Sequence, residues 1–250
     1  MAASPRQRRP SLPPRPPRPP RTTIREITNS DDPALRRVYA LLTRSFHHKE
    51  RVTLREWRDS LREKASELPL DTAWHLLVAE RAEQVVGLAS GTYLGNVNLG
   101  VIGYLAMVPS LRSLGIGTRL RSRLRAVFAR DAIRQGQPGL KGIIGEVNAN
   151  NPWLERLSLR PAVLVLDFIY YQPRLHVEHK PSPYVLYYES MQAPRARIPV
   201  GELQRILYTV WRRVYRVSRP LERPAFRAML HELKNRRFVG RWKFSTRGKS

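Results

Sequence analysis

The sequence contains no cysteine, so it can form no disulfide bond, no thiolate metal site and no cysteine nucleophile. It also lacks an apolar run of the roughly 18 to 20 residues that a membrane-spanning helix needs. The N-terminus is basic, but the apolar stretch of a signal peptide does not follow it. We therefore expect a cytoplasmic protein without a membrane span.

Acidic residues are scarce: 20 Asp and Glu stand against 45 Lys and Arg, which gives a formal net charge of +25. Such an imbalance favours anionic partners, whether nucleic acid or a phosphorylated cofactor. An arginine surplus also occurs without functional meaning, so nucleic-acid binding is possible but not favoured by charge alone. The six histidines are scattered and show no H-E-x-x-H spacing, so we expect no metal site.

Hydrophobic residues make up 42% of the 250 residues, which is enough for a substantial core. Residues 1–22 are mostly Pro, Arg and Ser without apolar periodicity, which predicts a disordered tail with polyproline-II bias. Its PxxP spacings could dock an aromatic groove, but a solvated tail is the simpler interpretation. We expect one continuous domain over residues 23–235, followed by a basic flexible tail over residues 236–250.

Hydrophobic periodicity predicts the order of elements within that domain. Strands are expected at 23–28, 74–81, 84–95, 99–109, 142–148, 162–172 and 184–190. Helices are expected at 30–46, 53–68, 115–134, 152–160, 200–215 and 224–235. This alternation is typical of an α/β protein with a mixed sheet and helices on its faces.

One turn in this order has the form of an anion site. In 111-LRSLGIGTRLRSRLRAVF-128, two glycines separate an apolar strand from a long basic helix. The first amides of that helix have no intrahelical partner and point toward the turn, as does the positive end of its dipole. A phosphate or pyrophosphate is the natural occupant. The P-loop lysine and the third glycine of the dinucleotide fingerprint are both missing.

The strand 101-VIGYLAMVP-109 followed by Arg112-Ser113-Leu114-Gly115-Ile116-Gly117 resembles motif A of the GNAT superfamily of acyl-CoA-dependent N-acetyltransferases. The segment 146-EVNANNPWLERL-157 is similar to the next strand and helix of that family, and the element order agrees over about residues 23 to 190. The resemblance implies a mixed, mostly antiparallel central sheet of about six or seven strands, flanked by helices. It implies acetyl-CoA, or another acyl-CoA, as cofactor. A glycine turn before an ordinary helix is the alternative.

The resemblance also assigns candidate cofactor contacts. It places the coenzyme A pyrophosphate on the backbone amides of the turn and first helical residues, with Arg112 shaping the loop. Met107 and Val108 would bind the pantetheine arm from the strand end, and Asn151 from the following helix. Arg119 or Arg121 could reach the adenosine phosphate. The turn residues are Leu114, Gly115, Ile116, Gly117 and Thr118.

The residue that would protonate the leaving thiolate, the general acid, departs from the family pattern. Many members carry a tyrosine where this chain has Ser158, and the Gly-Phe pair that follows is missing from 158–165. Tyr170 or Tyr171 could substitute, although tyrosines at strand ends often serve in packing. The segment 170-YYQP-173 also resembles a bacterial subgroup whose strand ends in Tyr-x-Gln-Pro.

Glu146 is the candidate general base, because it lies in an apolar strand where burial would raise its pKa. A buried partner for an arginine is its alternative role. His75 is more simply structural, and His47 and His48 fall at a helix end where an imidazolium favours the dipole.

The leading hypothesis is an acetyl-CoA-dependent N-acetyltransferase that lets a primary amine attack the thioester directly. The basic charge argues mildly against polycationic acceptors, and the sequence identifies neither the acceptor nor the oligomeric state. The alternative is a catalytically weak acyl-CoA-binding protein of the same fold that acts through its basic tails on nucleic acid or an acidic protein.

Overall fold

The computed structural model describes residues 21–66, 71–173 and 182–243, and the following account is confined to them. The strands are β1 Thr22–Ile27, β2 Thr72–Arg81, β3 Gln84–Leu94, β4 Leu99–Met107, β5 Gly142–Val147, β6 Val163–Gln172, β7 Ser182–Ser190, β8 Ile198–Pro199 and β9 Phe238–Val239. The helices are α1 Leu35–Ser45, α2 Leu54–Ala65, α3 Ile116–Arg134, α4 Pro152–Ser158, α5 Val200–Thr209 and α6 Pro224–Leu233.

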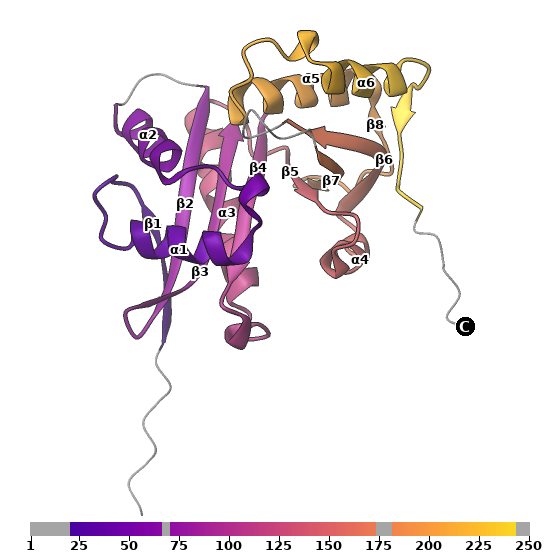
Figure 1. The fold of residues 1–250 in the computed structure, drawn as a ribbon. Helices are drawn as coiled ribbons and strands as arrows, with labels where there is room; N and C mark the ends of the chain where they lie inside the picture. The colour runs from indigo at the N-terminus through magenta and orange to yellow at the C-terminus, as the bar shows by residue number, and fades with distance from the viewer. Residues whose placement is uncertain (1–20, 67–70, 174–181, 244–250) are drawn as a thin grey trace, which may run out of the picture.

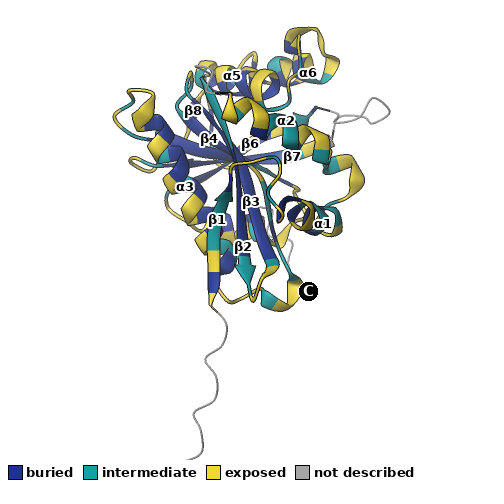
Figure 2. Ribbon diagram, turned by 90° about the vertical axis from the view of Figure 1, so that its left-hand side faces the viewer, coloured by how far each residue is buried: buried dark blue, intermediate teal, exposed yellow. Residues whose placement is uncertain are grey.

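Seven strands form one sheet in the order β1-β2-β3-β4-β5-β7-β6. Neighbours are antiparallel except for β4 and β5, which run parallel. Helices α1 and α3 lie on opposite faces of the sheet, and α5 and α6 pack together over the half that contains β6 and β7 (Figures 1 and 2). The expected class, a mixed and mostly antiparallel sheet of six or seven strands flanked by helices, is confirmed.

The parallel pair separates partway along its length. Leu99 to Ile102 of β4 pair with Gly142 to Gly145 of β5, and pairing stops there although both strands continue. Just beyond this point the register of β3 and β4 shifts between Ser90 and Gly91, so that Gly103 has no partner in β3. A bulge bends the strand that carries it. The two strands therefore diverge and leave a gap in the middle of the sheet.

Each face of the sheet is covered by its own apolar cluster. On the α3 face, Leu120, Leu124 and Phe128 pack against β2, β3 and Ile143 of β5. On the opposite face, α1 and α2 bury their apolar sides on the first strands. The second half of that face is filled by α5, α6 and Trp211, which is 1% exposed. The single helix expected at 200–215 is an α-helix to Thr209 followed by a π-helical turn over Val210–Val214.

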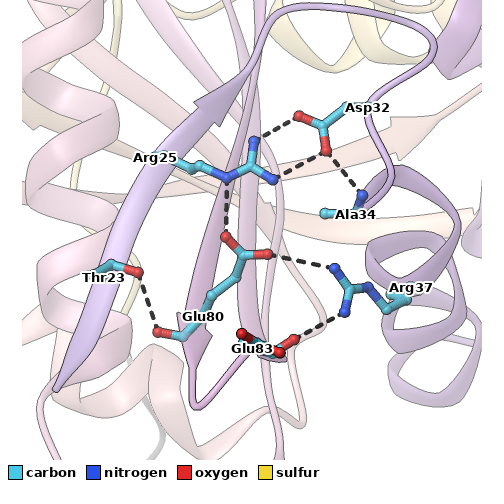
Figure 3. Close-up of polar contacts among 7 residues, drawn as sticks. All are labelled: Thr23, Arg25, Asp32, Ala34, Arg37, Glu80 and Glu83. Atoms are coloured by element: carbon cyan, nitrogen blue, oxygen red, sulfur yellow. Dashed lines mark hydrogen bonds and ion pairs between the residues drawn. The ribbon is translucent and has the colours of Figure 1, made fainter. Parts of the chain in front are cut away.

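An ion-pair network fixes β1 against α1 and β2 (Figure 3). Arg25 contacts both carboxylate oxygens of Asp32 and, through its Nε at 2.9 Å, the carboxylate of Glu80. Asp32 also accepts from the backbone amide of Ala34, the N-cap residue of α1, at 2.8 Å. Hydrogen bonding to Arg25 lowers the pKa of Asp32.

The predicted C-terminal boundary is wrong over residues 236–243. Strand β9 pairs with β8, and Val239 is 0% exposed. The chain then runs along the edge of β6, where the Trp242 amide donates to the Val165 carbonyl at 2.8 Å and the Asp167 amide to the Gly240 carbonyl at 2.9 Å. Exposed edge strands pair readily, so this segment covers an edge that would otherwise be open. At the other end Thr22 already belongs to β1, while 1–20 and 244–250 lie outside the described residues.

Candidate functional site

The glycine turn and the start of α3 form the first part of the site. Gly115 caps the helix in a left-handed conformation, with φ of 70°, and Ser113 before it has φ of 72°. A left-handed cap is natural for glycine, whereas Ser113 holds a strained conformation of the kind that clusters at functional sites. No side chain caps the helix, so its first amides face outward unpaired within the helix. Leu114 beside them is 55% exposed.

A cleft of about 1460 Å³ connects this turn with the gap between β4 and β5. Met107 and Gly117 both line it, and the Met107 sulfur lies 2.9 Å from where a β-carbon on Gly117 would stand. Arg112 and Asn151 line the same cleft. The structure therefore brings together four of the predicted cofactor residues on the α3 side of the sheet. Val108 is half-buried beside them, and its amide donates to the Val86 carbonyl at 3.0 Å.

Asn151 is the N-cap of α4. Its Oδ1 accepts from the Trp153 amide at 3.0 Å, which satisfies one of the free donors of that helix. The carboxamide nitrogen remains to donate into the cleft, because an amide side chain carries a separate acceptor and donor. The residue is thus fixed by its capping bond while it faces the cleft.

Glu146 lies on β5, across the gap from β4, and also lines the cleft. Its Oε2 accepts from the Tyr215 hydroxyl at 2.7 Å and from the Gln172 carboxamide at 3.0 Å, and no arginine pairs with it among the described residues. Burial raises the pKa of Glu146 to about 7, although these donors act to lower it. A carboxyl poised near neutral pH is suited to general-base chemistry.

The two tyrosines predicted as substitutes for the missing acid are placed differently. Tyr170 is 0% exposed and does not line the cleft, and its hydroxyl lies close enough to Glu146 to act on the pKa of that carboxyl. Burial raises its pKa well above the usual value for a phenol. Tyr171 packs at the edge of the α5 and α6 cluster and is not part of the cleft lining either.

Ser158 cannot take over the role from its own position. It is the last residue of α4, and its hydroxyl donates to the Glu155 carbonyl one turn earlier at 2.6 Å. It does not line the cleft.

The two arginines considered for the adenosine phosphate are both engaged elsewhere. Arg121 is 5% exposed, forms a bidentate ion pair with Glu189 and lies 5.9 Å from the Trp153 ring centroid. Arg119 donates to the Thr22 carbonyl at 2.9 Å, which ties α3 to β1. The idea that Arg121 reaches solvent phosphate is wrong, because a charge this deeply buried stays with its partner.

Sequence reasoning missed the residues that complete the cleft from the C-terminal half. Tyr184 and Tyr187 of β7 and Tyr215 after α5 all line it, far from the motif in sequence. The Tyr184 hydroxyl donates to Glu50 at 2.7 Å across the cleft. The sequence predicted a strand over 184–190, but not which strand it would join.

Two ion pairs lie beside the cleft. Arg216, in a left-handed conformation with φ of 54°, binds both oxygens of Glu63 at 2.7 and 2.9 Å. Arg213 contacts Asp71 at 3.3 Å. These contacts join the turn after the π-helical residues to the N-terminal half of the protein.

The histidines play structural parts within the described residues. His75 is 2% exposed, with Nε2 at 2.6 Å from Asp131 and Nδ1 at 2.7 Å from Glu26. His47 accepts from the Lys49 amide at the short helical turn that follows α1. Across the described ranges no three His, Asp or Glu side chains converge as metal ligands would, and no helix has the length and apolarity to cross a membrane.

Comparisons with known proteins agree with this fold. Residues 35–136 match the model of the Acetyltransferase (GNAT) family. The solved structure of a GNAT-family acetyltransferase from Bacteroides thetaiotaomicron is 18% identical, with a TM-score of 0.58 over 78% of this chain and 99% of that one. No curated protein matches the sequence.

Two further solved structures are less similar. The ribosomal-protein-S18-alanine N-acetyltransferase of Escherichia coli is 14% identical, with a TM-score of 0.46 over 69% of this chain and 97% of that one. The PaiA N-acetyltransferase of Thermoplasma acidophilum in complex with coenzyme A is 11% identical, with a TM-score of 0.46 over 68% and 99%. Both TM-scores lie below 0.5, so we draw no conclusion from these two.

Proposed function

We propose that this chain, whose residues 35–136 match the GNAT acetyltransferase family model, transfers the acetyl group of acetyl-CoA to a primary amine by direct attack on the thioester. The family uses acetyl-CoA as acyl donor, which supplies an activated thioester and a thiol leaving group. The observation that carries the proposal is the position of Glu146, a carboxyl with a pKa of about 7, in the same cleft as the glycine turn.

The residues of the chain fit this cofactor. The unpaired amides at the start of α3 offer donors to a pyrophosphate, and a β-carbon on Gly115 would meet nothing within 4 Å, so the turn is open. Met107 at the end of β4 and Asn151 after β5 lie on the same face of the sheet, where they would hold the pantetheine arm. We propose Leu114, Gly115, Ile116, Gly117 and Thr118 as the pyrophosphate site, with Arg112 and Val108 beside it.

The acceptor enters from the other side of the sheet. Glu146 lies on that side, where Tyr215 and Gln172 hold its Oε2, and the carboxylate takes a proton from the ammonium form of the acceptor. The free amine then attacks the acyl carbon in the gap between β4 and β5. Holding both reactants at this gap in a fixed orientation supplies much of the rate enhancement.

Calorimetry with acetyl-CoA tests the cofactor site. We expect micromolar binding by the wild type and its loss in Gly117→Trp, whose indole would fill the turn. Thr118→Glu is a second variant: a carboxylate in the first turn favours the helix dipole, so the fold is kept, but it repels the pyrophosphate and should weaken binding at least about tenfold.

Gly139→Trp is the matched control, because a β-carbon there meets nothing within 4 Å and the residue is not part of the cleft. Absence of binding by well-folded wild type would refute the transferase proposal. Turnover is then sought with a panel of primary amines, small and peptidic, by release of free thiol.

The alternative of a weak acyl-CoA binder acting through basic tails has no observation in its favour here. Residues 1–20 and 244–250 lie outside the described part of the chain, and residues 236–243 are bound to the sheet.

A further inference from the structure

Breaking a thioester requires a proton for the departing sulfur, and the expected donors do not supply it. Ser158 is turned onto its own helix, and Tyr170 is fully buried on the Glu146 side of the sheet, outside the cleft lining. A donor must instead lie on the α3 and α4 side of the sheet, where the glycine turn, Met107 and Asn151 place the cofactor.

Tyr187 of β7 lies at the required place. It pairs in register with Gly145, the last residue of β5 that is still bonded to β4. A β-carbon on Gly145 would stand 2.5 Å from the Tyr187 hydroxyl oxygen. The phenol therefore lies directly against the backbone where the gap opens, in space that any other residue at position 145 would fill. Tyr187 lines the cleft although it is 2% exposed.

Tyr187 and Glu146 face opposite sides of the sheet. Tyr187 packs with Val147 and Leu154 on the α4 side, because alternate strand residues point to opposite faces. Glu146 bonds to Tyr215 on the other side. A thioester held from the α4 side can be reached by an amine from the Glu146 side only between the separated strands. The phenol and the carboxyl flank that one position.

The surroundings of Tyr187 suit a neutral phenol that loses its proton briefly. Burial raises the pKa of Tyr187 and keeps it protonated at neutral pH, whereas Arg121 acts to lower it. The Arg121 guanidinium lies 5.8 Å from the ring centroid and only donates hydrogen bonds, so it leaves the phenol proton for another acceptor. Of the other charges that act on the ring, Glu189 raises the pKa and Arg160 lowers it.

We propose that Tyr187 is the catalytic proton donor to the leaving sulfur, in place of the tyrosine that is absent at position 158. This inference rests on the proposed function. The amine nitrogen forms a bond to the acyl carbon and gives up its second proton to solvent as the amide forms. The carbon–sulfur bond breaks with its electron pair on sulfur, and the Tyr187 proton moves to that sulfur. The surplus proton of the ammonium has gone to Glu146. Solvent then returns a proton to the phenolate beside Arg121 and takes one from Glu146.

Binding calorimetry with coenzyme A and with desulfo-coenzyme A, which lacks the sulfur, tests the contact without turnover. We expect Tyr187→Phe to weaken coenzyme A binding by about 2- to 10-fold, the effect of one neutral hydrogen bond, and to leave desulfo-coenzyme A binding unchanged. The substitution keeps the ring and its packing. Equal effects on both ligands, or no effect on either, would overturn the proposal.

Turnover gives the second readout, with hydroxylamine as a small neutral acceptor. Tyr187→Phe should lower kcat about 100-fold, while the KM for acetyl-CoA stays within about twofold. Ser158→Ala and Tyr171→Phe are the matched controls and should retain wild-type kcat. A wild-type kcat in Tyr187→Phe would refute the role of the phenol while leaving the transferase assignment intact. Failure of the folded wild type to bind acetyl-CoA would refute both.

Discussion

Replacing Glu146 with Gln should make the protein more stable at alkaline pH. Burial raises the pKa of Glu146 from its ordinary 4.5 to about 7 in the folded state. The folded protein therefore holds a proton that the unfolded chain has released between these values, and stability falls as pH rises through that window. At about 1.36 kcal/mol per pH unit, ionisation of this carboxyl costs the fold about 3 kcal/mol.

The glutamine variant avoids this cost, because its carboxamide can accept from Tyr215 and Gln172 without a charge. Urea unfolding of both proteins at about pH 4.5 and pH 8 measures the difference. The free energy of unfolding of the variant, relative to wild type, should increase by about 3 kcal/mol over that range. In a domain of this size the corresponding gain in Tm is roughly 6 to 12 °C.

Glu202→Gln is the control, because the pKa of Glu202 is shifted in the opposite direction from that of Glu146. Hydrogen bonds from Arg195 and Lys141 lower the pKa of Glu202 to about 2, so its stabilisation is present above the unfolded pKa and is lost only as pH falls toward 2. The difference between Glu202→Gln and wild type should stay nearly constant over the same range. If the Glu146→Gln difference is equally flat, Glu146 ionises as an ordinary surface carboxyl and the reasoning about the base fails.

The same group sets the pH dependence of activity. A base must be deprotonated, so kcat/KM of the wild type should rise as pH increases through about 7 and then level off. Glu146→Gln should be about 100-fold slower or more at pH 8 and lose that rise.

Other predictions concern the fold. Gly100→Ala should lower the free energy of unfolding, measured by urea titration, by about 1 to 3 kcal/mol, because a β-carbon would stand 2.1 Å from a ring carbon of the buried Phe128. Gly139→Ala should leave this free energy unchanged, because a β-carbon there meets nothing within 4 Å. Removing residues 244–250 should leave the Tm unchanged, but removing residues 236–250 should lower it by several degrees, since β9 and the cover of the β6 edge are lost. Equal Tm values for the two truncations would contradict the packed C-terminal segment.

Local patterns determined the parts of the site that lie within one stretch of chain. The left-handed turn at Gly115, the free start of α3 and the placement of Glu146 in a buried strand all follow from residues adjacent in sequence, because turn chemistry and strand periodicity act over a few residues. The order of strands and helices could be predicted for the same reason, and the seven-stranded mixed sheet followed from it.

Tertiary structure decided which side chains meet. The gap between β4 and β5 depends on a bulge at Gly103. The pairing of β7 with β5 brings Tyr187 against Gly145, which is 42 positions away in the chain. Arg121 looked like a surface cation in its basic helix, yet Glu189 holds it in the interior. The basic C-terminus looked like a tail, yet the bonding needs of the β6 edge order residues 236–243. These outcomes depend on pairing between distant strands, which short-range patterns in the sequence do not encode.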